Sequence, residues 1–265
     1  MVASLPLSLL AIAFYLAGAS WLWLRLLGKV PEKKQLVQVL GSFAFIHHSL
    51  VLFDALGLPS QLHLGLAEVA LLLTWLTCSF ILFASLRHPT LNLGALLFPL
   101  AALALAFAQF TDRPTNLLTK DHQLYFHILA SLSAYGLFAL ASVQSVLLGM
   151  QNYQLKHRHL QGLISVLPPL QIMERLLFDL LLAGQLLLTL GMLSGWLYFD
   201  HFFAPGLLHK TLLSFMAWII FGILLFGHWR FGWRGLTAVR WTLGGSLLLL
   251  LAYFGSQFVL QFLLA

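Results

Sequence analysis

The sequence predicts an all-α, polytopic integral membrane protein with about eight transmembrane helices and both termini outside. The composition is the first reason. Of the 265 residues, 60% are hydrophobic and only 8% are charged, which is more apolar surface than a soluble domain of this length can bury. The second reason is that the apolar residues form Leu- and Ala-rich runs of roughly 20 residues, the length that crosses a bilayer core of about 30 Å. The third is that the basic residues concentrate in alternate breaks between these runs.

Eight apolar segments are expected to be the spanning helices. Short polar breaks such as KVPEKK and RHPT separate them, and no long linker or repeat is visible, so we expect 1–265 to form a single transmembrane domain. The segment at the N-terminus lacks a basic leader and is as long as a full span, which argues against a cleaved signal peptide. The small residues AGAS keep that alternative open. The expected spans are 4–27, 35–56, 65–86, 91–110, 122–149, 176–199, 209–229 and 240–262.

The positions of Lys and Arg predict the orientation. Eleven of the 14 basic residues fall on one side of the expected membrane, and the other side carries Arg113, Lys120 and Lys210. The odd-numbered connections are therefore expected in the cytoplasm. The net charge of +6 then indicates contact with anionic lipid and not with nucleic acid. The eleven are Arg25, Lys29, Lys33, Lys34, Arg87, Lys156, Arg158, Arg175, Arg230, Arg234 and Arg240.

The connection at 150–175 is the longest and mixes basic with apolar residues before a break at Pro168-Pro169. Two interpretations stay open, a short helix lying in the membrane interface and a plain basic loop that obeys the charge rule.

The sequence shows no arrangement of residues that is typical of an active site, so we do not expect the protein to catalyse a reaction of its own. The few carboxylates lie near the expected span ends, without a paired acid/base arrangement, an HExxH motif or a glycine-rich phosphate loop. The single cysteine, Cys78, excludes an internal disulfide and a CxxC site.

Histidine is the unusual residue, with eleven in a chain that is poor in charge. Those at 47, 48, 127 and 228 lie within or at the ends of expected spans. A neutral imidazole costs less in a membrane than a carboxylate does, and it is a common axial ligand of haem iron. A hydrogen bond to a neighbouring helix is the alternative role.

Depth restricts which histidines could share an iron. His48 is expected about 12 Å and His127 about 8 Å below the outer ends of their spans, so both are compatible with one site in the outer half. His228 is expected at the inner end of its span, and pairing it with His48 would need a tilted or broken helix. His209, at an outer end, is a further partner for His127.

Three blocks of the sequence resemble the cytochrome c assembly family of CcsA/CcmC-type haem-handling membrane proteins, most closely its YpjD-like inner-membrane branch. They cover about 122–262, in the family's order. The blocks are HILASLSAYGLFALASVQSVLLGMQNYQLK, MERLLFDLLLAGQLLLTLGMLSGWLYF, and HKTLLSFMAWIIFGILLFGHWRFGWRG followed by LLLLAYFGSQFVL.

The resemblance implies a multi-pass protein of the bacterial cytoplasmic (inner) membrane. It implies that His228 is a haem ligand inside the membrane and that His127 is one at the outer face; the depth comparison adds His48. The implied cofactor is haem b, bound without a covalent link. The implied partners, besides membrane lipid, are cytochrome c maturation or haem-synthesis proteins; no nucleic acid is expected.

The aromatic and basic residues around His228 have two readings. Arg230 and Arg234 follow the charge rule, and Trp229 and Trp233 fit an interfacial aromatic belt. Pairing of the arginines with haem propionates is the alternative.

The sequence departs from the family in one external loop. Haem-presenting members carry a tryptophan-rich WGxxWxWDP-like motif, where this chain reads FDHFFAPGLLHKT, and a second external histidine near the C-terminus is also missing. Direct haem presentation to apocytochrome does not fit this pattern. His201 and His209 are the nearby histidines that would have to substitute.

Three alternative functions are therefore considered, ranked by how well the sequence supports each. The first is haem binding or handling related to cytochrome c biogenesis. The second is a HemX-like regulator of haem synthesis or sensing that acts through a protein partner. The third is a small-solute transporter, for which an inverted repeat is lacking.

Overall fold

The computed structural model describes residues 4–56, 62–63, 65–111, 117–118, 122–157, 167–198 and 208–255. Within these ranges, eight helices are long and apolar enough to cross a membrane. This confirms the all-α, polytopic membrane fold. The side on which the termini lie stays a prediction.

The chain divides into two compact units, the first made of residues 1–120 and 158–168 and the second of 121–157 and 169–265. The expectation of a single domain over 1–265 stays a prediction. The first unit contains α1 (Ser4–Leu26), α2 (Lys34–Ala55), β1 (Leu62–His63), α3 (Leu66–Ala84), the 3-10 helix η1 (Leu91–Leu93), α4 (Gly94–Gln109) and β2 (Leu117–Leu118). The second contains α5 (His122–Lys156), α7 (Leu170–Tyr198), α8 (Leu208–Phe231), α9 (Leu236–Leu250) and the π-helical turn η2 (Leu251–Gly255).

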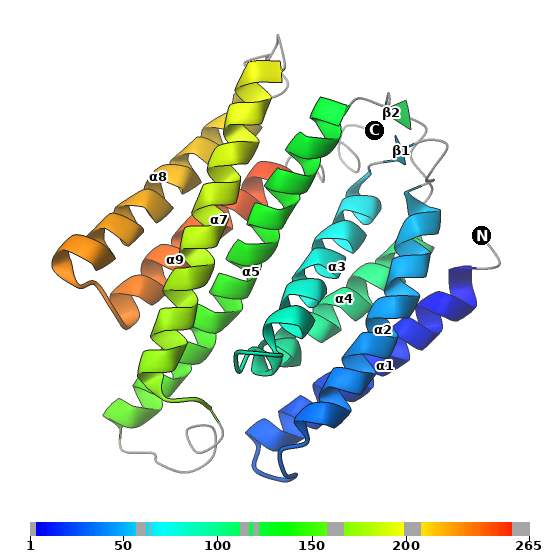
Figure 1. Ribbon diagram of the computed structural model, residues 1–265, viewed down its shortest axis with the longest axis horizontal. Helices are drawn as coiled ribbons and strands as arrows, with labels where there is room; N and C mark the ends of the chain where they lie inside the picture. Colours follow the sequence, from blue (N-terminus) through cyan, green and yellow to red (C-terminus); the bar gives the residue numbers. More distant parts are fainter. Residues whose placement is uncertain are drawn as a thin grey trace. The chain divides into compact units, whose positions relative to one another are not determined.

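In the first unit, α1, α2, α3 and α4 pack side by side (Figure 1). Helix α1 packs on α2 and α4, and α3 packs on the same two helices. The ring of Phe98 is fully buried, and a Cβ added at Gly18, Gly41 or Gly94 would lie 3.4, 3.2 or 2.8 Å from it. Because lipid provides little hydrophobic drive for helices to associate, such close packing at small residues is what holds them together. The two-residue strands β1 and β2 pair antiparallel.

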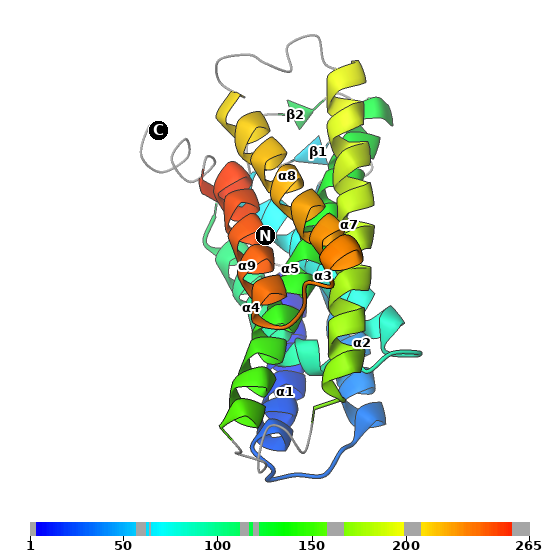
Figure 2. The same ribbon diagram turned by 90° about the vertical axis from the view of Figure 1, so that its left-hand side faces the viewer.

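The second unit repeats this arrangement with a stacked aromatic pair. Helix α5 packs on α7 and α9, and α8 packs on the same two (Figure 2). Phe138 of α5 and Phe221 of α8 stack with their ring centroids 3.9 Å apart. Gly184 of α7 and Gly245 of α9 lie against these rings, and an added Cβ would come within 3.1 and 2.7 Å of them. The glycines thus let the rings sit between the helices.

Two boundaries differ from those expected from hydropathy. Helix α5 continues to Lys156 and α7 begins at Leu170, so the connection between them is shorter than 150–175. The residues at each end of that range prolong the spanning helices, because Gln, Leu and Lys are good helix formers even where the sequence turns polar. Helix α7 starts directly after Pro169, whose carbonyl accepts from Met173 N. The two interpretations of this connection, an interfacial helix and a plain basic loop, now concern 158–166, which lie outside the described residues.

The last span was also placed differently. Helix α9 begins at Leu236, four residues before the expected 240, because the turn before it ends at Gly235. The expected residues 256–262 lie outside the described part of the chain.

Candidate functional site

The segment FGHWRFGWRG ends α8 with an αL cap, in which a glycine in the left-handed conformation follows the last helical turn. The amide of Gly232 donates to the carbonyl of His228 at 3.0 Å, and the amide of Trp233 donates to the carbonyl of Gly227 at 3.2 Å. Gly232 has φ +68°, a left-handed conformation that glycine adopts without steric cost. The cluster of residues seen in the sequence therefore follows from how this helix ends.

Packing on the turn fixes the position of Trp233. Its indole lies against Gly227 so closely that any Cβ there would overlap the ring, and it also contacts Trp241 with centroids 5.5 Å apart. The amide of Gly235 donates to Glu174 Oε1 of α7 at 3.0 Å. Trp229 is 81% exposed, which is compatible with a place in an interfacial aromatic belt. Trp233 instead has a packing role that the sequence interpretation missed.

This turn sets the tautomer of His228. The Nδ1 atom lies 2.9 Å from the carbonyl oxygen of Trp233. A carbonyl only accepts, so Nδ1 carries the proton, and in the neutral ring the lone pair is on Nε2. The imidazole also stacks on Phe178 of α7, with centroids 3.5 Å apart and planes 16° from parallel. Stacking covers a ring face and leaves the ring edge, where a metal would bind, unaffected.

His127 has the same arrangement at another place in the second unit. Its Nδ1 lies 2.9 Å from the carbonyl oxygen of Gly191 and 3.1 Å from Ser194 Oγ, both in α7. The carbonyl again requires a proton on Nδ1, which puts the neutral ring's lone pair on Nε2. A second-sphere carbonyl that orients an imidazole in this way is typical of histidines that ligate metals.

The two histidines contact α7 at well-separated points. His228 lies against Phe178 and His127 against Gly191, which is 13 residues further along the helix, or about 20 Å at the α-helical rise. Two imidazoles bound to one metal bring their nitrogens within about 4 Å of each other. The structure therefore keeps His127 and His228 too far apart to share one iron. This agrees with their expected depths, near the outer and inner ends of their spans.

His48 is enclosed within the first unit. Its side chain is fully buried, Nδ1 lies 3.3 Å from the hydroxyl of Tyr15, and the two rings meet edge to face. The Leu71 carbonyl lies nearby, but Nε2 has no partner with hydrogen-bonding geometry among the described residues. A buried nitrogen without a partner is uncommon and requires an explanation.

The other histidines discussed above are less informative. His47 is half-buried, and its Nδ1 bonds the carbonyl of Phe43 one turn earlier in α2, at 2.7 Å. His209 lies in α8 but its side chain is outside the described part, as is the whole of His201. Among the described residues, three or more His, Cys, Asp or Glu side chains do not converge on any metal-sized site.

The sequence interpretation did not identify the partners of these histidines. Tyr15 is the detectable one, since a tyrosine hydroxyl at membrane depth needs a polar partner. Phe178 and Gly191 give no local signal, because they lie in an ordinary apolar helix and become neighbours of His228 and His127 only through packing.

Comparison with known proteins gives two kinds of match. The family described as cytochrome C assembly protein matches residues 36–264. The inner membrane protein YpjD of Escherichia coli is 30% identical over 259 residues, covering 96% of this chain and 97% of its own. A 28.8 kDa protein from the nifR3-like 5′ region of Azospirillum brasilense is 33% identical, covering 76% of this chain and 77% of its own. No solved structure matches the chain.

Proposed function

Because the chain belongs to the cytochrome c assembly protein family, we propose that it binds haem b within the bacterial inner membrane and handles it for cytochrome c biogenesis. Family membership rests on the match over residues 36–264 and on the 30% identity to YpjD. The eight helices of spanning length, together with the name of that relative as an inner membrane protein, support the assignment to the inner membrane.

The observation that carries the proposal is the hydrogen bond from His228 Nδ1 to the Trp233 carbonyl. It holds the imidazole in the tautomer with the lone pair on Nε2, which is the form in which His228 would bind the iron of a haem. When bound, haem supplies a redox-active iron. Trp233 fixes the angle of the ring through its carbonyl, and Phe178 covers one face of the ring and keeps water from it.

The charges next to His228 suit the carboxylates of haem. Arg230 and Arg234 lie on the same turn and are exposed. Within the described residues, neither forms an ion pair with a carboxylate. Arginine binds carboxylates through charge-assisted, often bidentate hydrogen bonds. These two residues are the candidates for holding the propionates.

His127 is the candidate for a second and separate site. The Gly191 carbonyl orients it just as the Trp233 carbonyl orients His228. His48 fits less directly: its Nε2 is a buried nitrogen that a ligand would satisfy, but the ring is fully enclosed. We therefore rank His228 first, His127 second and His48 third as haem ligands.

The absorption spectrum of the full-length protein, purified from haem-replete cells in mild detergent, tests this function. The expected result is a Soret band and a pyridine haemochrome of the b type. Strains that lack the protein should contain less c-type cytochrome when haem is limiting. A protein that shows no Soret band, either as purified or after haem is added, would refute the proposal.

A further inference from the structure

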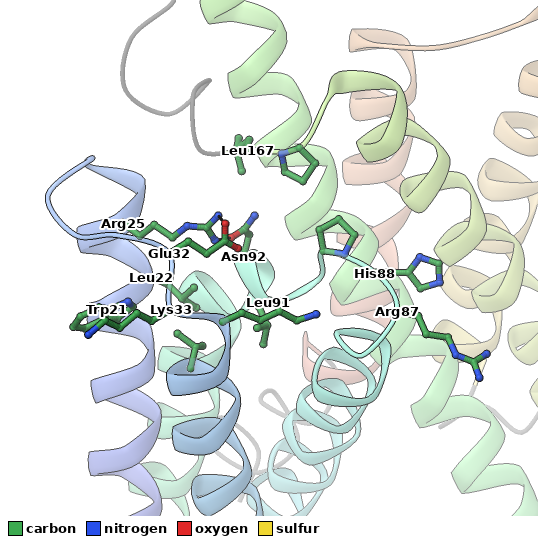
Figure 3. Close-up of a pocket in the computed structure, with 14 residues that line it drawn as sticks. Trp21, Leu22, Arg25, Glu32, Lys33, Arg87, His88, Leu91, Asn92 and Leu167 are labelled. Atoms are coloured by element: carbon green, nitrogen blue, oxygen red, sulfur yellow. Dashed lines mark hydrogen bonds and ion pairs between the residues drawn. The ribbon is translucent and has the colours of Figure 1, made fainter.

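A cavity of about 370 Å³ lies in the first unit, apart from the histidines described above. It is formed where α1 ends and α2 begins, by the connection from α3 to η1, and by Leu167 and Pro168 (Figure 3). One part of its wall is apolar, including Leu22, Val37 and Leu91. The other part is polar and strongly basic.

The charges in the wall are unbalanced. Four basic residues line the cavity and Glu32 is its carboxylate, which gives a formal charge of +3. Glu32 forms an ion pair with Arg25, with Oε2 and Nη2 2.8 Å apart. Nη1 of Arg25 also donates a hydrogen bond to Asn92 Oδ1 at 2.9 Å. Figure 3 shows these three side chains pointing toward one another. The other basic residues are Lys33, Lys34 and Arg87, and none of them forms an ion pair with a carboxylate in the described part of the chain.

A hydrogen-bond donor without an acceptor lies in the same wall. The indole Nε1 of Trp21 is buried and has no hydrogen-bond partner among the described residues. Indole nitrogen only donates, so its missing partner is an acceptor. The ammonium of Lys33 lies 5.4 Å from the centroid of the same indole. The pocket thus combines a positive potential with an unused donor, which is what an anion with several acceptor oxygens would satisfy.

We propose that this pocket binds the phosphate of an anionic phospholipid headgroup from the surrounding leaflet. Phosphate offers acceptor oxygens to the two lysines and to the Trp21 indole, and the glycerol would lie against the apolar wall. The pocket lies at the ends of helices long enough to span a membrane, the depth at which headgroups are found. Basic pockets between spanning helices are known to select such headgroups.

Titration of the full-length protein with lipid, followed by native mass spectrometry in detergent, tests the assignment. Phosphatidylglycerol should be retained more tightly than phosphatidylcholine, which carries no net charge. Lys33→Gln and Lys34→Gln should each weaken phosphatidylglycerol binding about fivefold, the value expected for one basic residue near an anionic surface. Trp21→Phe, which removes the indole donor and keeps an aromatic ring, should weaken it as well.

Lys29→Gln is the matched control, because Lys29 is an exposed lysine of the same connection that does not line the cavity. Equal losses in Lys29→Gln and Lys33→Gln would overturn the assignment, since they would indicate a diffuse charge effect. Equal retention of the two lipids would also overturn it. Displacement of phosphatidylglycerol by equimolar glycerol 3-phosphate would show a soluble phosphate ester to be the ligand and would overturn the lipid source. Thermal unfolding of each variant confirms that the comparison is made on folded protein.

Discussion

The imidazole of His228 and the phenyl ring of Phe178 stack with centroids 3.5 Å apart, which joins the end of α8 to the first turns of α7. Phe178 is 7% exposed, so its ring is a buried part of the second unit. The contact links helix packing to the orientation of the candidate ligand.

Replacing Phe178 by Leu should therefore keep the fold and weaken haem binding. Leu retains most of the apolar volume but cannot stack, so the imidazole gains rotational freedom. We expect faster haem loss to apomyoglobin in a transfer assay, with a melting temperature close to that of the wild type. Phe226→Leu, at a position 55% exposed on α8, is the control. Unchanged haem transfer from Phe178→Leu would show that the stack has no part in binding.

The packing of the turn after α8 predicts how glycine substitutions change the stability of the protein. A Cβ at Gly227 would overlap the Trp233 indole, so Gly227→Ala should destabilise the protein by about 1–3 kcal/mol, as overpacked sites do. Gly244 of α9 has open space around its Cα. Gly244→Ala should be neutral or stabilising by up to about 1 kcal/mol. Thermal unfolding in detergent measures both, and equal effects would contradict the packing described.

The hydrogen bond between Tyr15 and His48 predicts how substitutions in the first unit change the stability of the protein. Tyr15→Phe keeps the ring that packs on Phe98 and removes the hydroxyl next to His48 Nδ1. A buried polar atom that loses its partner costs about 1–3 kcal/mol. Tyr153→Phe, at a position 63% exposed, should have little effect. Calorimetric or fluorescence-monitored melting would separate the two, and a fully stable Tyr15→Phe would show that this bond contributes little.

The orientation of the chain is tested by reporter fusions at three connections. The eleven-to-three distribution of basic residues predicts that the connections around Lys33, Lys156 and Arg234 face the cytoplasm. Alkaline phosphatase fused there should be inactive and green fluorescent protein fluorescent. An active phosphatase at Lys156 would reverse the topology.

How much could be predicted from the sequence depends on the range of the interaction involved. The spans are encoded in about 20 consecutive residues each, and hydropathy located all eight. Helix ends were located less well, because α5 continues through polar residues to Lys156, where hydropathy falls but helix propensity does not. The position of His228 at a glycine-rich turn was visible in FGHWRFGWRG. Its contact with Phe178, 50 residues away in the chain, depends on tertiary packing, for which one sequence contains no local signal.

The most direct test of the account is the haem-to-protein ratio of the purified variants His228→Ala, His127→Ala and their combination. Because the two histidines contact α7 about 20 Å apart, each single variant should lose its own portion of the Soret absorbance, and the double variant should lose the sum. His47→Ala, which removes a half-buried histidine whose Nδ1 hydrogen bond lies within its own helix, should leave the ratio unchanged. A wild-type ratio in His228→Ala would contradict the central claim that His228 is a haem ligand.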